Sequence, residues 1–191
     1  MENQLILASS SPRRQELLRQ VRIPFTLRVP NLDESQIITN DPYEKVEQLA
    51  MLKGRHVSIE KENEVILSAD TVVAFQNKIF EKPKSKQEAK EVITALSGEV
   101  HHVYTGVMIR SEKAEEIFVE KTEVEFWPLL NEEIDSYVSS EEPYDKAGAY
   151  GIQSIGAMFV KRITGDYYNV VGLPVSRVMR ELYSFSVKPK L

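Results

Sequence analysis

The chain has 191 residues, 42% of them hydrophobic, and a formal net charge of −5. This length and composition predict a single globular domain over residues 1–191 with a sizeable buried core. The acidic balance argues against general binding of nucleic acid, which relies on a basic surface. The chain has no cysteine, which excludes disulfides and thiolate metal sites. Neither a basic leader nor an apolar run of the ~20 residues that cross a bilayer is found, so we expect a cytoplasmic protein that binds no membrane.

The first predicted unit is a strand, a turn and a helix. Residues 5–8 are apolar, serines follow at 9–11, and a helix is expected over 12–22. Arg13 and Arg14 stand in its first turn, where the positive end of the helix dipole normally favours acidic residues. Backbone N–H groups, hydroxyls and guanidinium groups at a helix start together suit an anion such as phosphate.

Two charged residues interrupt the apolar patterns of the next two elements. Residues 42–58 have helical spacing, and Lys53 falls on their apolar stripe. A lone lysine there more often snorkels to solvent than serves a site. Residues 64–75 form a β-branched strand that contains Asp70. A buried carboxylate is costly unless it is paired, protonated or metal-bound, so Asp70 is either a catalytic residue or an aspartate that caps a strand end.

The remaining elements are expected to be mostly scaffold. A capping box at Ser85 and Glu88 predicts a helix, and residues 101–127 predict a long hairpin. Lys82 precedes a proline and is therefore extended, either into a site or into solvent. Residues 143–156 are rich in glycine, which indicates either backbone close to a ligand or a surface turn.

The C-terminal part reads as a β pair followed by a helix. Residues 156–174 predict two strands around Gly165 and Asp166, and a last helix is expected from Pro174 to about Phe185. This helix has an apolar face for packing, and we assign it no chemistry.

The usual phosphate-binding and hydrolase motifs are missing, including the P-loop, the dinucleotide fingerprint, the serine nucleophile elbow and H-E-x-x-H. The remaining candidates are hydroxyls, cations and acids: Ser9, Arg13, Arg14, Lys53, Lys82, Lys146, Asp33, Glu34 and Asp70. Carboxylates beside phosphate suggest Mg²⁺ or Mn²⁺, because these hard ions take oxygen ligands from one or two acids and from the substrate. The residues themselves therefore favour a metal-assisted phosphate site.

Seven blocks of the sequence resemble the Maf family of nucleoside triphosphate pyrophosphatases, from about Leu5 to Leu182. They are LILASSSPRRQELL, the pair DE at 33 and 34, LSADTVV, EKP, LSGEVHHVYTGV, EPYDKAGAYGIQ and GDYYNVVGLP, in the family's order. The resemblance implies an α/β domain with a long twisted mixed central sheet flanked by helices, and two lobes around a cleft, similar to inosine triphosphate pyrophosphatases. It also implies hydrolysis of a nucleoside triphosphate to the monophosphate and diphosphate with a divalent metal cation, Mg²⁺ or Mn²⁺.

The resemblance also implies roles for individual residues. Asp70 matches the family's proton acceptor, and Arg13, Thr71 and Gln153 match positions associated with base choice in the subgroup that acts on dTTP and UTP. The expected catalytic residues are Asp70, Lys53 and Lys82; the expected substrate-binding residues are Ser9, Arg13, Arg14, Thr71, Lys146 and Gln153; the expected metal ligands are Glu34 and Asp70. Whether Asp70 acts as base, metal ligand or both stays open.

Three interpretations of function follow. The first is a pyrophosphatase for dTTP and UTP that removes unwanted or modified nucleotides. The second is a related enzyme for purine or methylated-purine triphosphates. The third is a nucleotide-sensing protein, because Maf-like proteins are associated with septum formation and cell-division arrest. Asp70, Lys82 and Arg13 together favour catalysis, since a sensor needs no general base. The expected partner is the nucleotide, without nucleic acid or membrane, and a homodimer is left open.

Overall fold

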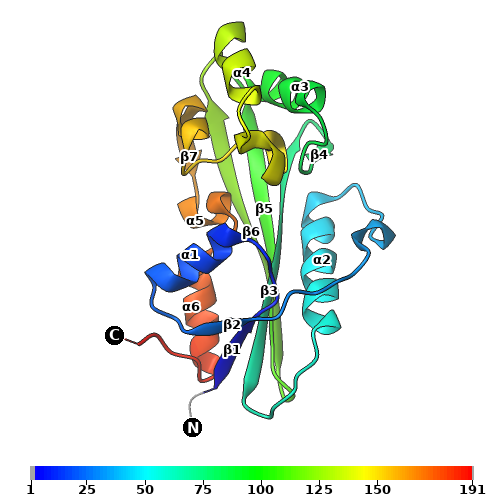
Figure 1. Ribbon diagram of the computed structural model, residues 1–191, viewed down its shortest axis with the longest axis vertical. Coiled ribbons are helices and arrows are strands. Elements are labelled where there is room, and N and C mark those ends of the chain that lie inside the picture. The colour runs from blue at the N-terminus through cyan, green and yellow to red at the C-terminus, as the bar shows by residue number, and fades with distance from the viewer. Residues whose placement is uncertain (1–2, 191) are drawn as a thin grey trace.

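The computed structural model describes residues 3–190, and its centre is one mixed seven-stranded sheet (Figure 1). The strands are β1 (Gln4–Leu7), β2 (Phe25–Leu27), β3 (Glu64–Phe75), β4 (Lys78–Phe80), β5 (Val100–Arg110), β6 (Glu115–Phe126) and β7 (Val160–Thr164). In the sheet they are ordered β2, β1, β3, β5, β6 and β7, and β4 pairs with β3. β1 is parallel to β2 and β3, whereas the other pairs are antiparallel. The α/β fold class with a mixed central sheet is confirmed.

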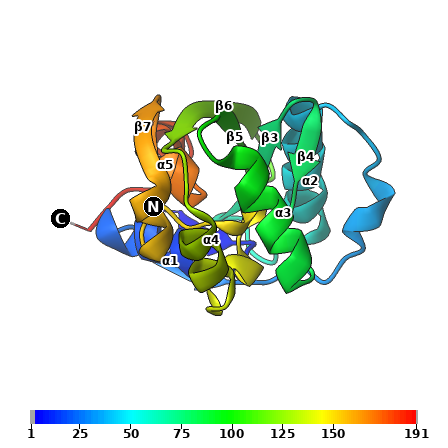
Figure 2. The same ribbon diagram turned by 90° about the horizontal axis from the view of Figure 1, so that it is seen from above.

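Helices cover both faces of the sheet and one of its ends. The α-helices are α1 (Pro12–Gln20), α2 (Pro42–His56), α3 (Lys86–Leu96), α4 (Asn131–Val138), α5 (Tyr167–Val171) and α6 (Val175–Ser184). Short 3₁₀ helices are η1 (Glu34–Gln36), η2 (Glu142–Asp145), η3 (Ala147–Ala149) and η4 (Ile155–Phe159). α2 lies on one side of β3 and α1 and α6 on the other (Figure 1), while α3 and α4 pack together over one end (Figure 2). No helix within residues 3–190 is long and apolar enough to span a membrane.

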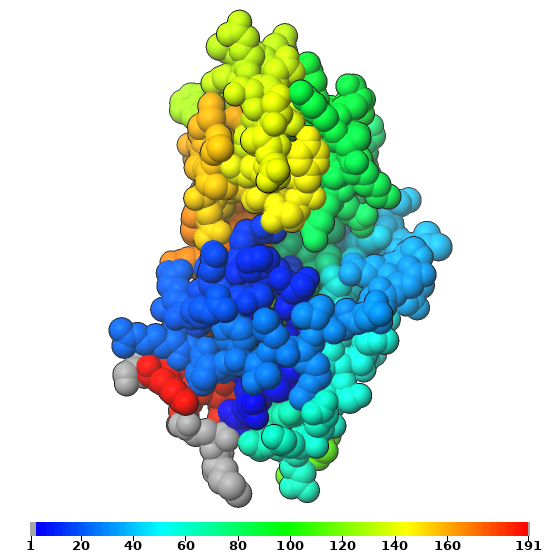
Figure 3. Space-filling view, in the orientation of Figure 1, coloured from blue at the N-terminus to red at the C-terminus, as the bar shows by residue number. Residues whose placement is uncertain are grey.

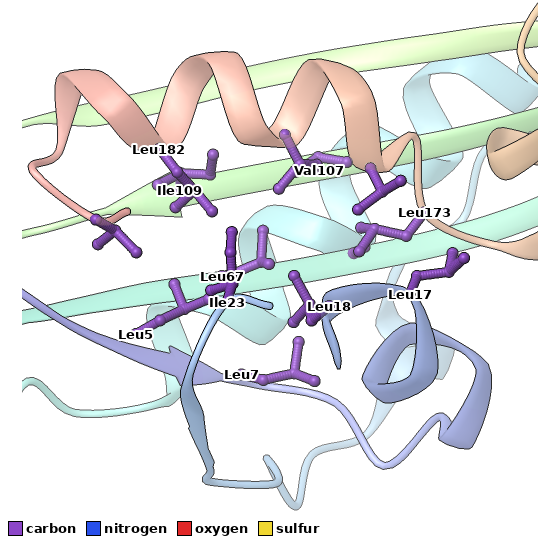
Figure 4. Packing of buried hydrophobic residues seen from close by; sticks show 14 of the residues in the cluster. Leu5, Leu7, Leu17, Leu18, Ile23, Leu67, Val107, Ile109, Leu173 and Leu182 are labelled. Atoms are coloured by element: carbon purple, nitrogen blue, oxygen red, sulfur yellow. The ribbon is translucent and has the colours of Figure 1, made fainter. Parts of the chain in front are cut away.

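The long strand β3 contributes to two large hydrophobic cores and to a smaller cluster around Ile66. In the first, Leu67 packs with residues of β1, α1 and α6, among them Leu7 and Leu182 (Figure 4). In the second, Val73 packs with residues of α3 and α4. These cores define a lower and an upper lobe in the orientation of Figure 1. Asp70 lies midway along β3 between Leu67 and Val73, so it lies at the junction of the lobes.

One edge of β3 is left open at this junction. β1 pairs with β3 as far as Leu67, whose carbonyl also accepts from the Ala8 N–H at 2.8 Å, and β4 begins pairing only at Val73. Between them the N-terminal chain leaves the sheet through its serine turn and starts α1. Residues 68–72 therefore have no strand beside them on this edge among the described residues. The gap is where a cleft can form.

The prediction of two paired strands in residues 156–174 is wrong for the second strand. Val160–Thr164 does form β7, which pairs with β6. The following segment forms helix α5 instead, because the Oδ1 atom of Asp166 accepts from the Tyr168 N–H at 2.8 Å and caps the first turn. The strand over 64–75, the hairpin, and the helices at residues 12, 42, 86 and 175 are confirmed.

Candidate active site

A cleft with a volume of about 1080 Å³ lies over the open edge of β3. Its walls come from the start of α1, from α2, and from the segment that contains η2 and η3. In Figure 3 this yellow segment of the upper lobe meets the blue N-terminal segment across the face of the molecule. All the site residues expected from the sequence line this one cleft: Ser9, Arg13, Arg14, Glu34, Lys53, Asp70, Thr71, Lys82, Lys146 and Gln153. The fold thus brings together positions from both lobes.

Lys53 joins two carboxylates in the cleft. Its Nζ atom lies 2.5 Å from Oδ1 of Asp70 and 3.2 Å from Oε1 of Glu34. Alternation along β3 puts Asp70 on the face covered by α2, where Lys53 is found. Their side chains are only 13% and 14% exposed. Lys53 is therefore held by ion pairs and does not snorkel to solvent, and Asp70 lies within a strand and does not cap its end.

The same pair of carboxylates suits a hard divalent cation. Glu34 and Asp70 converge on one positive charge, and one or two acids with phosphate oxygens are the ligands that Mg²⁺ ordinarily takes. Residues 3–190 contain no group of three or more His, Cys, Asp or Glu side chains that could hold a metal. The donors therefore fit an ion shared with substrate. Asp33 is not among them. Its Oδ1 atom accepts from the Ser35 N–H at 2.9 Å at the start of η1, and hydrogen bonds from the side chain and the backbone of Ser35 lower the pKa of Asp33.

Arg14 is buried, and the protein uses most of its donors. The guanidinium donates to the carbonyls of Ala69 and Gly172 (both 2.8 Å), to Oγ of Ser9 (3.3 Å) and to Oγ1 of Thr71 (3.1 Å). The Ala69 carbonyl is the next one on the β3 edge after that of Leu67, so Arg14 replaces the partner that β1 no longer supplies. Burial lowers the pKa of Arg14, and the Asp70 carboxylate opposes this. These contacts favour a structural role.

Arg13 on α1 forms an ion pair with Asp145 on η2 across the cleft. Among the described residues, it is the only ion pair between these two elements. The Arg13 guanidinium donates to Oδ2 of Asp145 at 2.7 Å and to the Asp145 carbonyl at 3.1 Å. The other carboxylate oxygen of Asp145 accepts from Lys146 at 2.7 Å. Burial raises the pKa of Asp145, but the hydrogen bonds from Lys146 and Arg13 outweigh it and lower the pKa overall. One carboxylate thus holds two of the cations expected to bind substrate.

Two other expected residues line the cleft with side chains that bind no other described residue. Lys82 and Gln153 are exposed and line the cleft. Neither side chain makes a hydrogen bond or ion pair with another described residue. Thr71, in contrast, is fixed by a 2.8 Å hydrogen bond to the hydroxyl of Thr105 and by Arg14.

The sequence reasoning missed five charged residues that line the cleft: Glu16, Lys45, Glu81, Lys84 and Asp145. Asp145 stands next to Lys146, but adjacency does not reveal a bond to Arg13, which is 132 positions away. Lys45 lies two turns before Lys53 on α2 and donates to the Ile37 carbonyl at 3.0 Å. Its helical spacing from Lys53 was an available signal.

Comparisons with known proteins identify the family of this chain. The family model described as Maf-like protein matches residues 4–185. A dTTP/UTP pyrophosphatase of Halalkalibacterium halodurans is 50% identical over 186 residues, covering 96% of this chain and 98% of that protein. A dTTP/UTP pyrophosphatase of Bacillus cereus (strain G9842) is 48% identical over 183 residues, covering 96% of each.

A solved structure supports the fold alone. The structure of a HAM1 protein from Coxiella burnetii matches with a TM-score of 0.56 and 16% identity, covering 95% of this chain and 99% of that chain. It shares the arrangement of sheet and helices described above. Because the family model spans nearly the whole chain and the relatives share about half of its residues, this chain belongs to the Maf family.

Proposed function

We propose that the protein hydrolyses dTTP and UTP to the nucleoside monophosphate and diphosphate, acting on free nucleotides in the cytoplasm. The observation that carries the proposal is the Asp70–Lys53 pair at the open edge of β3, in a cleft that is also lined by Arg13, Thr71 and Gln153. The two relatives described above bear the name of this activity. A purine-specific enzyme and a non-catalytic sensor are not favoured by these relatives.

Asp70 acts as the proton acceptor in the proposed reaction. Its carboxylate accepts a proton from a water molecule, and the water oxygen attacks the α-phosphorus. The bond from the α-phosphorus to the bridging oxygen breaks, and diphosphate leaves with that electron pair. Lys53 holds Asp70 at 2.5 Å and keeps the carboxylate in place. Lys82 and Lys146 offset the negative charge that spreads over the phosphoryl oxygens.

Glu34 and Asp70 are the residues that would hold a divalent cation together with the substrate phosphates. When bound, such an ion neutralises phosphoryl charge and stabilises the leaving diphosphate. Ser9 and Thr71 present hydroxyls that Arg14 orients, so Arg14 supports substrate contacts without making them itself.

Gln153 is the proposed reader of the base. A uracil or thymine edge offers an acceptor, a donor and an acceptor, and a glutamine amide offers one acceptor and two donors. The amide can pair with two adjacent groups of that edge, whereas cytosine reverses part of the pattern. A site built on such polar pairs rejects bases that leave its groups unpaired.

The test is diphosphate release from dTTP, UTP, CTP, dATP and GTP with Mg²⁺ or Mn²⁺. We expect dTTP and UTP to be the best substrates. Asp70→Asn should lower turnover by the ~10²–10⁴ typical of a general base, while nucleotide still binds. Asp135→Asn, an exposed carboxylate on α4 paired with Lys90, is the control and should leave turnover unchanged. Full turnover by Asp70→Asn, or faster hydrolysis of the purine triphosphates, would contradict the proposal.

A further inference from the structure

The turn that carries Gln153 is closed tightly upon itself. The Ser154 N–H donates to the Gly151 carbonyl, and a Cβ atom on Gly156 would lie 2.7 Å from that same carbonyl oxygen. The two glycine backbones are therefore in contact, and a side chain at position 156 would push them apart. Gln153 stands within this closed turn, so its direction depends on what holds residues 151–156.

A carboxylate from η2 binds the far end of the turn. Oε1 of Glu142 accepts from the Ser154 hydroxyl and from the Gly156 N–H at 3.3 Å, and Oε2 accepts from the Ile155 N–H at 3.3 Å. These N–H groups begin η4, and a helix start needs acceptors for them. Ser154, the residue at the cap position, makes no such bond with its side chain. Glu142, which lies in η2, therefore caps η4 in place of Ser154.

Glu142 does not line the cleft, whereas Gln153 and Ser154 do. The Glu142 carboxylate therefore contacts the cleft lining through the turn and not directly. Its own backbone is also fixed, because the Glu142 carbonyl accepts from Nζ of Lys146 at 2.8 Å. The carboxylate thus connects the segment that carries Lys146 to the turn that carries Gln153.

We infer that Glu142 is a positioning residue for base selection: it caps η4 and so holds Gln153 in register with the base. The inference rests on the proposed role of Gln153. A carboxylate is suited to the place because all three of its partners are donors and it offers only acceptors. Glutamine would turn an NH₂ group toward one of them and leave that donor unpaired.

The experiment compares kcat/KM for UTP and CTP in the wild type, Glu142→Gln, Gln153→Ala and Glu141→Gln. Glu141 is the neighbouring exposed glutamate, and its side chain bonds to no other described residue. We expect the UTP preference to fall about tenfold in Glu142→Gln, the size expected when one polar pair is misplaced. Turnover on UTP should change much less, and Glu141→Gln should behave as the wild type.

Loss of preference in Gln153→Ala but not in Glu142→Gln would overturn the inference and leave the proposed function standing. An unchanged preference in Gln153→Ala would overturn the base-reading role of Gln153 and the inference with it. If Glu142→Gln fails to fold, Ser154→Ala removes one donor to the same carboxylate. The UTP preference should then fall about threefold, and an unchanged ratio would overturn the inference.

Discussion

Arg14 and Arg13 are neighbours, but the structure gives them different partners, and substitution should separate their functions. Arg14→Met keeps most of the side-chain volume and removes the guanidinium. The buried Ala69 carbonyl then loses its described donor, and the Gly172 carbonyl keeps only the 3.3 Å hydrogen bond from Oγ1 of Thr71. Each unsatisfied buried acceptor costs ~1–3 kcal/mol, so we expect the free energy of unfolding to fall by ~3–5 kcal/mol, a large share of the ~5–15 kcal/mol of a typical domain.

Urea denaturation followed by circular dichroism measures this loss. Arg13→Met is the matched control: its partner Asp145 is 58% exposed, so the variant should lose at most ~1 kcal/mol. Arg14→Lys should recover only part of the stability, because one ammonium cannot serve two separate carbonyls as a guanidinium does. A variant Arg14→Met that unfolds within ~1 kcal/mol of the wild type, yet no longer binds triphosphate, would refute the structural role and restore the phosphate contact expected from the sequence.

Three further predictions concern charge and packing. Asp145→Asn removes the carboxylate that occupies Arg13, so KM for dTTP and the inhibition constant for diphosphate should fall about three- to tenfold, while a rise in KM would mean that the carboxylate aligns the arginine. The hydrogen bonds from Arg28 lower the pKa of Glu64 to about 2 from its usual 4.5, so stability is retained above pH 4.5 and lost as the pH falls toward 2. Because Arg28 is partly exposed, we expect this loss to be ~1–2 kcal/mol and absent in Glu64→Gln, as urea titrations at several pH values would measure. Gly106→Ala would place a methyl group against the backbone carbonyl oxygen of Val46 on α2. Overpacking of ~2–3 kcal/mol should lower its Tm by ~4–12 °C, and an unchanged Tm would contradict the packing described here.

The elements that the sequence predicted well are those in which local pattern and tertiary packing agree. The run at residues 64–75 and the stripe at 42–58 have one dominant periodicity each, and both elements formed as expected. The residues of the segment YYNVV favour β structure, yet the segment forms α5. Its helix is stabilised by contacts from elsewhere: the buried amide of Asn169 donates to the Val103 carbonyl at 3.1 Å and to Oγ1 of Thr122 at 2.9 Å. Such long-range contacts leave no periodic signal.

The sequence could predict which residues line the cleft together, but not which partner each side chain binds. Residue type and order placed Arg13 and Arg14 together as anion contacts, since both carry the same charge at the same helix end. Their difference depends on which acceptors reach each guanidinium. For Arg14 these include carbonyls of Ala69 and Gly172, far away in the sequence. The pairing of Lys53 with Asp70 likewise depends on α2 covering one face of β3.

Charge in the cleft explains how an acidic protein can receive a triphosphate. Seven basic and five acidic residues line the cleft, a positive excess of two in a chain whose net charge is −5. This positive charge is confined to the cleft, because the net charge of the whole chain is negative. Without substrate, Asp145 satisfies Arg13 and Lys146, and Glu34 with Asp70 satisfies Lys53. In the proposed function, binding of a phosphate group at Arg13 exchanges one anion for another. Each arginine at the start of α1, the positive end of the helix dipole, then always has a counter-charge or a hydrogen-bond acceptor.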